Sequence, residues 1–182
     1  MLPKIKILDE KNKTLRMISK EVTFPLDDKT KTIINDTLKY LEMSQKDEYI
    51  EKYNLRPGMG LAFIQLGLPK RIFVICNEKD DGDFEKYVVI NPKIVSHSEE
   101  QIYVEEGEGC LSANRPVDGI VPRYARISIE AKDLDGNTVT YRLREELSVA
   151  FQHEIDHLNG ILFTDKIDKK NPFKNKDKMR EI

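Results

Sequence analysis

The segment His153-Glu154-Ile155-Asp156-His157 constrains this chain more than any other part of its sequence. If the segment is helical, residues four positions apart lie on one face, and both histidines can offer an imidazole nitrogen to one divalent cation. Glu154 then lies about 100° around the helix from His153, where it can reach the open side of the ion without binding it. This H-E-x-x-H spacing marks a candidate metal site with a general base beside it. A chance match among ordinary helix residues is the alternative.

The surrounding residues predict that this segment is helical. Glu145 and Glu146 stand where the first turn would begin, and the helix dipole favours acidic side chains there. Asn159-Gly160 would end the helix, because glycine is common just past a helix C-terminus. Glu154 is the one carboxylate in an otherwise apolar stripe, and burying a carboxylate is costly unless it has a function. The apolar members of the stripe are Leu147, Ala150, Phe151, Ile155 and Leu158.

Composition limits the number of domains and the classes of partner. The 182 residues suit one domain, and 39% apolar residues can build one core. The formal net charge of −2 comes from mixed signs, so we expect no DNA partner. No apolar run is long enough to span a membrane, and the first residues lack the apolar core of a signal peptide. Two cysteines indicate a reducing cytoplasm, with one Cys76–Cys110 bridge as the alternative.

Hydrophobic periodicity predicts an α+β fold. A packing helix is expected from about residue 28 to 44, capped by Asp27 or Asp28, and a polar surface insertion over 45–57. The expected domain has short antiparallel sheets and hairpins around the central metal-binding helix, and it spans residues 1–168. A polar basic tail, frayed or lying as a surface element, follows at 169–182. The predicted strands are 71–76, 87–91, 93–96 and 101–104, with a hairpin of 126–132 and 138–143 around Asp133–Asn137.

A catalytic site of this kind needs a third protein ligand and one open position. Phe163 stands where one family of zinc proteases has its third histidine. Asp177 and Glu181 lie downstream in the polar tail, with no strong helix to fix them. Cys110 is the better candidate, because a thiolate is a strong ligand for a soft or borderline cation. A buried structural cysteine is the alternative reading of this residue.

Three segments, taken together and in this order, identify a protein family more specifically than any one of them does alone. They are Gly58–Gln65 (GMGLAFIQ), Glu108–Ser112 (EGCLS) and Gln152–Gly160 (QHEIDHLNG). Together they resemble the three motifs of peptide deformylases. The first segment departs from the family at Phe63, where a second alanine is usual.

The resemblance extends from about residue 2 to 168. The insertion at 45–57 and the long segment between Cys110 and Arg123 are similar to the branch common in Gram-positive bacteria and mycoplasmas. The resemblance implies removal of the formyl group from the N-terminal formyl-methionine of nascent polypeptides, with release of formate. Such a protein is expected in the bacterial cytoplasm, near the ribosome exit. An H-E-x-x-H zinc metallopeptidase is the enzyme alternative, and a structural metal domain or binding module is the non-enzyme alternative.

The resemblance also implies a metal centre in which Cys110, His153 and His157 hold one ion per chain. Ligand softness and tetrahedral geometry alone favour zinc. The family implies ferrous iron, with Zn²⁺, Ni²⁺ or Co²⁺ as possible replacements. Metal-bound water would attack the formyl carbon, with Glu154 as general base and then as proton donor to the leaving amine.

Further residues receive roles from the same resemblance. The side-chain amide of Gln65 and the backbone N–H of Leu111 would donate hydrogen bonds to the oxyanion. The substrate peptide would add as a strand beside Gly58, Met59 and Gly60 and beside the residues after Cys110. A side chain at Gly60 would block that approach.

Two further expectations concern the surroundings of the metal. Glu108, beside a buried metal loop, needs a cationic partner, for which Arg123 is the first candidate and Arg115 the second. The methionine pocket needs apolar walls, and Ala150 of the predicted helix is expected in them.

Overall fold

The structure is a computed structural model that describes residues 1–182. Its larger sheet is packed on both faces. Alternate side chains of strand β2 (Ile72–Glu78) point to opposite sides: Phe73 and Ile75 join the core around helix α3, whereas Ile72 and Val74 join the core under helix α1. A strand buried on both faces has a continuous apolar sequence, which is why 72–76 shows no polar alternation.

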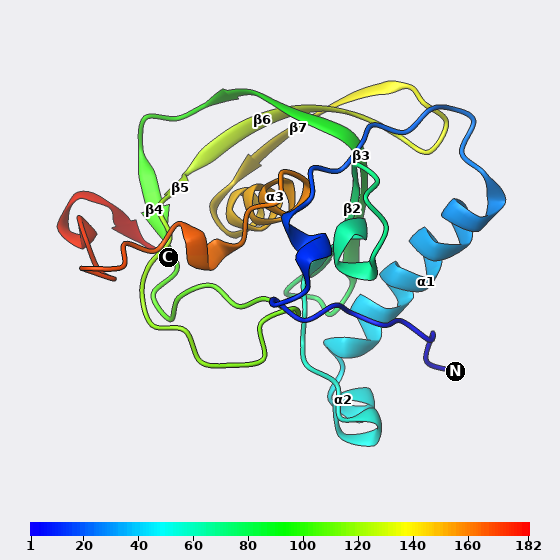
Figure 1. Cartoon of the computed structure of the whole chain (residues 1–182), viewed down its shortest axis with the longest axis horizontal. Coiled ribbons are helices and arrows are strands. Elements are labelled where there is room, and N and C mark those ends of the chain that lie inside the picture. Colours follow the sequence, from blue (N-terminus) through cyan, green and yellow to red (C-terminus); the bar gives the residue numbers. More distant parts are fainter.

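The larger sheet has five strands in the order β1-β2-β3-β6-β7, and every pair in it is antiparallel. The other members are β1 (Gly60–Ala62), β3 (Phe84–His97), β6 (Arg126–Lys132) and β7 (Thr138–Arg144). The predicted hairpin of 126–132 and 138–143 is confirmed, with one more residue at its end. Figure 1 shows the sheet curving around α3.

The expected separation between strands at 87–91 and 93–96 is wrong, because β3 continues through both segments. Pro92 has no N–H to donate, and the register with β6 shifts between Ile90 and Lys93. Asn91 adopts a left-handed backbone conformation (φ 50°) and its side chain bonds to both the N–H and the C=O of Val22. The proline is therefore accommodated in a bulge.

Helix α1 (Asp28–Ser44) has the predicted bounds. Asp27 caps it by accepting a 2.7 Å hydrogen bond from the N–H of Thr30. The 45–57 insertion contains a short helix that the sequence analysis did not predict, α2 (Asp47–Tyr53). None of its residues is buried, so it has no apolar stripe to reveal it.

Helix α3 (Glu145–Leu158) occupies the centre of the molecule. Phe151, Ile155 and Leu158 join the main core cluster, which also includes residues of β2, β3, β6 and β7. The predicted helix is thus confirmed. Its burial is not limited to the predicted stripe, because every residue from Phe151 to Leu158 is buried, whereas Leu147 and Ala150 are half-buried. Cys76 and Cys110 are free thiols, so the alternative disulfide does not form. No helix has the length and hydropathy that crossing a membrane requires.

A second, smaller sheet has the order β5-β4-β8. Its strands are β4 (Gln101–Tyr103), β5 (Arg123–Tyr124) and β8 (Arg180–Glu181), and β8 runs parallel to β4. Residues 176–181 thus form surface elements, a 3-10 helix (Lys176–Lys178) followed by β8, rather than a frayed end. In Figure 1 this red segment returns to β4 after leaving the core.

Candidate active site

Three electron-pair donors from a loop and from α3 converge on one buried point. The Sγ atom of Cys110 lies 3.3 Å from Nε2 of His157, which lies 3.2 Å from Nε2 of His153. All three side chains are buried, and their ligand atoms lie within 4.8 Å of one another. Asp177 and Glu181, the downstream alternatives, are not part of this group.

The spacing of these donors fits one divalent cation. Tetrahedral coordination with metal–nitrogen bonds near 2.05 Å and a metal–sulfur bond near 2.3 Å separates two nitrogens by roughly 3.3 Å and nitrogen from sulfur by roughly 3.6 Å. The observed 3.2 Å and 3.3 Å are close to these values. Burial holds the pKa of His157 well below its usual value, which keeps the ring neutral, as a ligand must be.

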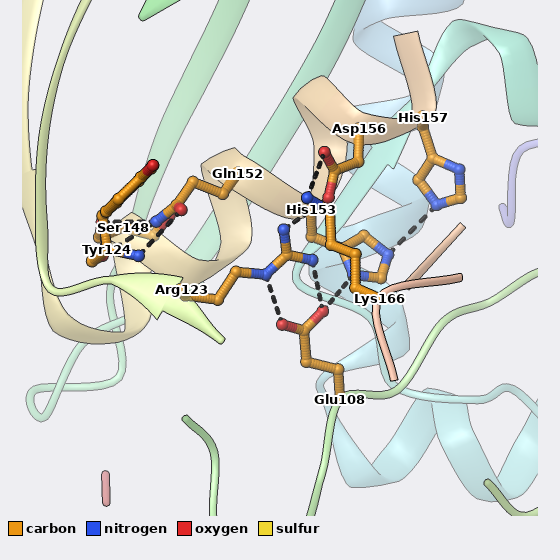
Figure 2. Close-up of polar contacts among 9 residues, drawn as sticks. All are labelled: Glu108, Arg123, Tyr124, Ser148, Gln152, His153, Asp156, His157 and Lys166. Atoms are coloured by element: carbon orange, nitrogen blue, oxygen red, sulfur yellow. Dashed lines mark hydrogen bonds and ion pairs between the residues drawn. The ribbon is translucent and has the colours of Figure 1, made fainter. Parts of the chain in front are cut away.

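The orientation of the His153 ring is fixed by a contact at Nδ1, the nitrogen that faces away from the other two metal-ligand candidates. Its Nδ1 lies 2.8 Å from Oε2 of Glu108, a contact drawn as a dashed line in Figure 2. Nδ1–H therefore donates to the carboxylate, and Nε2 keeps its lone pair for the cluster. Burial raises the pKa of Glu108, but the hydrogen bonds from Arg123 and His153 outweigh it and lower the pKa to about 2.

Arg123 joins two carboxylates in the same network. Its Nε and Nη2 donate to Glu108 over 2.7 and 2.9 Å, and its Nη1 donates to Asp156 over 2.5 Å (Figure 2). The side chain of Arg123 is only 2% exposed. Arg115, the second candidate partner of Glu108, pairs instead with Glu10.

Two residues of the third motif have contacts that the sequence analysis missed. Asp156 binds Arg123 and also Nζ of Lys166 at 3.3 Å. Gln152 accepts a hydrogen bond from the N–H of Tyr124 and donates to its C=O, which holds α3 against β5 (Figure 2). Arg123 and Tyr124 are distant in sequence from Asp156 and Gln152, so the only available signal was the place of Asp156 and Gln152 inside the motif.

Glu154 is buried beside the metal-ligand candidates without being one of them. Its Oε2 atom has no hydrogen-bond partner. Burial raises the pKa of its carboxyl to about 7. A Cβ atom built at Gly60 would lie only 2.5 Å from Oε1 of Glu154 and 2.7 Å from Ile75. The packing around position 60 therefore admits a side chain only if Glu154 and Ile75 move.

Gln65 is also held in one orientation. Its Oε1 accepts a 2.8 Å hydrogen bond from the N–H of Ala62, and its Nε2 donates to Oγ of Ser112 and lies 3.6 Å from Sγ of Cys110. The amide nitrogen therefore points toward the metal-ligand candidates. Phe63, where the chain departs from the first family motif, is buried in the core under α1 and does not line the cavity.

A cavity of about 350 Å³ opens in front of these groups. Its wall includes Glu154 and Gln65, two of the metal-ligand candidates (Cys110 and His153), and Glu108. The expected substrate-binding residues and Ala150 also line it: Gly58, Met59, Gly60, Leu111 and Ala150. Strand β1 is the edge strand on this side of the sheet.

The polypeptide deformylase family model matches residues 4–173. A relative from Geobacillus stearothermophilus, Peptide deformylase 2, is 46% identical over 167 residues, which are 92% of this chain and 91% of the relative. The crystal structure of a peptide deformylase from Legionella pneumophila has a TM-score of 0.75 and 32% identity, and covers 96% of this chain and 92% of that one. That of a class I type b peptide deformylase from Acinetobacter baumannii, bound to Met-Ala-Ser, has a TM-score of 0.71 and 25% identity, with 92% and 100% covered. Since the family model and the relatives cover most of its length, this chain belongs to the polypeptide deformylase family.

Proposed function

We propose that this protein hydrolyses the formamide bond of N-formyl-methionyl peptides, releasing formate and a free amino terminus. The observation that carries the proposal is the convergence of one buried thiol and two imidazoles beside an unpaired buried carboxylate, in a cavity edged by a free strand. Membership of the family supports the same reaction. Formyl-methionine begins nascent bacterial chains, so we place the reaction in the bacterial cytoplasm near the ribosome exit.

Cys110, His153 and His157 are proposed to hold one divalent cation per chain. We take it to be Fe²⁺, with Zn²⁺, Ni²⁺ or Co²⁺ as replacements, because the family resemblance implies iron and the donor set of one sulfur and two nitrogens accepts all four. When bound, such a cation supplies Lewis acidity that lowers the pKa of a water molecule toward neutrality.

Glu154 is proposed as the general base and then the general acid. A carboxyl whose pKa is raised to about 7 by burial can both accept and return a proton near neutral pH. Its carboxylate accepts the proton of the attacking water, and the protonated form delivers it to the amine as the C–N bond breaks. A structural metal site would need no such group, which argues against a purely structural module.

Gln65 and Leu111 are proposed to stabilise the oxyanion that forms on the formyl oxygen. The Oε1 atom of Gln65 is already bonded to the N–H of Ala62, so the Nε2 end is the one presented to the ligand cluster. Loss of one such donor typically lowers the rate by roughly 10²–10³-fold. Gln65→Ala should therefore lower kcat by that amount with little change in KM.

The substrate backbone is proposed to add as a strand along β1 (Gly60–Ala62) on one side and along the residues after Cys110 on the other. Gly58 and Met59, just before β1, line the cavity at this edge. The methionine side chain would enter between apolar side chains of α3, among them Val149 and Ala150.

The direct test is formate release from formyl-Met-Ala-Ser by the metal-loaded protein. The matched variant is Glu154→Gln, which keeps the size of the side chain and removes its basicity. We expect retained metal and a fall in kcat of roughly 10²–10⁴-fold. Equal rates in both proteins would refute the role of Glu154. Cleavage of internal peptide bonds without formate release would favour a metallopeptidase instead.

A further inference from the structure

Ile182 lines the catalytic cavity although it lies 25 residues beyond His157 in the chain. It packs on a small core cluster made of Ile102, Ala125 and Val149, which Val104 also contacts. Val104 and Val149 line the same cavity. The three aliphatic side chains of Val104, Val149 and Ile182 therefore form one continuous apolar wall. They come from the residue after β4, from α3 and from the residue after β8.

The backbone of this segment is fixed by strand pairing. Arg180 and Glu181 pair in parallel with Ile102 and Tyr103. The N–H of Ile182 donates to the C=O of Tyr103 over 3.0 Å, and the C=O of Ile182 accepts from the N–H of Glu105 over 3.1 Å. The position of Ile182 beside the cavity is thus set by hydrogen bonds on both sides of its residue.

Arg180 ties the same segment to the helix that carries the ligand histidines. Its Nη1 and Nη2 donate to both carboxylate oxygens of Glu145 over 2.9 and 2.8 Å, and its Nε donates to Glu100 over 2.8 Å. Glu145 is the first residue of α3, and Glu100 precedes β4. A planar guanidinium that bonds two carboxylates fixes geometry as well as charge. Arg180 therefore holds β8 against the start of α3 and against the residues before β4.

We propose that residues 180–182 belong to the substrate site, with Ile182 selecting for a long apolar first side chain and Arg180 positioning it. This proposal rests on the proposed function, because it assigns the wall to the side chain that follows the formyl group. An alanine side chain at that place in the substrate is too short to use the wall fully, whereas methionine extends along it. The contribution of Ile182 should therefore depend on the substrate.

The test compares formyl-Met-Ala-Ser with formyl-Ala-Ala-Ser for the wild type and three variants. The variants are Ile182→Ala, Arg180→Ala and, as the matched control, Lys178→Ala, since Lys178 is an exposed cation of the same segment that makes no ion pair. Deleting part of an apolar pocket wall changes discrimination by roughly 10-fold. We expect the methionine-to-alanine ratio of kcat/KM to fall by about that factor in Ile182→Ala, mainly through KM, and in the same direction in Arg180→Ala. Lys178→Ala should keep the wild-type ratio.

A binding measurement separates this proposal from the proposed function. Calorimetric affinity for the peptide Met-Ala-Ser, measured with metal content and melting temperature, does not require turnover. Suppose that the wild type releases formate and that folded, metal-loaded Ile182→Ala keeps both the wild-type ratio of kcat/KM and the wild-type peptide affinity. This result would refute the role of Ile182 and leave the proposed function intact. If the wild type releases no formate but Ile182→Ala binds the peptide more weakly, Ile182 contributes to peptide binding and the proposed function is refuted.

Discussion

The Nδ1 atom of His153 and the Oε2 atom of Glu108 lie 2.8 Å apart, so a ligand candidate from α3 is oriented by the loop that carries Cys110. Glu108 stands two residues before Cys110 in the chain. The loop thus supplies one ligand candidate directly and holds another through its carboxylate. Metal affinity should therefore depend on residues that never touch the ion.

Glu108→Ala should lower metal affinity by roughly 10–100-fold, because His153 loses the acceptor that fixes its tautomer and ring orientation. Competition with a chelator of known affinity measures the change. Glu10→Ala is the matched control, since Glu10 also pairs with an arginine, Arg115, but outside the network around the cluster. Equal loss of affinity in both variants would contradict a specific role for Glu108.

Arg123→Ala should lower the free energy of unfolding by about 3–5 kcal/mol, because it leaves the buried carboxylates of Glu108 and Asp156 without their cation. Urea denaturation measures the change. Arg115→Ala should cost less than about 1 kcal/mol, since its pair with Glu10 is half exposed on the arginine side. A similar loss in both variants would show that burial of the Arg123 network has no special energetic weight.

Gly60→Ala should be destabilising by about 1–3 kcal/mol and should also lower activity. The added Cβ would lie 2.5 Å from Oε1 of Glu154 and 2.7 Å from Cδ1 of Ile75, so one of these side chains must move. Gly109→Ala is the stability control, because a Cβ there meets nothing within 4 Å. Comparable melting temperatures for Gly60→Ala and the wild type would mean that Glu154 is free to shift.

The attachment of β8 should weaken in acid. Arg180 lowers the pKa of Glu100 and of Glu145 below their usual 4.5, with further effects from Arg126 on both and from Arg144 on Glu145. Carboxyls with lowered folded-state pKa contribute stability above their unfolded pKa and lose it as the pH falls through the folded value. The stability difference between wild type and Arg180→Ala should thus be constant from about pH 7 to 6 and shrink below about pH 4.5. Urea denaturation across this range measures it, and a difference that grows in acid would contradict the ion pairs.

Local signals predicted the two long helices, α1 and α3, the second of which carries His153 and His157. Helix α3 follows from acidic residues at its start, an apolar stripe and the Asn159-Gly160 stop, and α1 follows from its period and from the cap at Asp27. These features depend on residues within a few positions of one another, so the sequence displays them. The partner of Glu108 was also predicted, because a buried carboxylate needs a cation and Arg123 was the first candidate, ahead of Arg115.

Features that depend on distant contacts were not predictable in this way. Strand β8 has two residues, and only its pairing with β4 makes it a strand. Helix α2 has no buried face, and the continuity of β3 past Pro92 depends on contacts between Asn91 and Val22. The presence of Ile182 in the cavity follows from β8, so it could not be inferred before that strand was known.

The most direct measurement of the central claim is the extended X-ray absorption fine structure of the bound metal, in protein prepared without air. One sulfur near 2.3 Å and two nitrogens near 2.0–2.1 Å are expected, with the sulfur lost in Cys110→Ala. A first shell without sulfur in the wild type, or a sulfur that persists in Cys110→Ala, would contradict a site built from Cys110, His153 and His157.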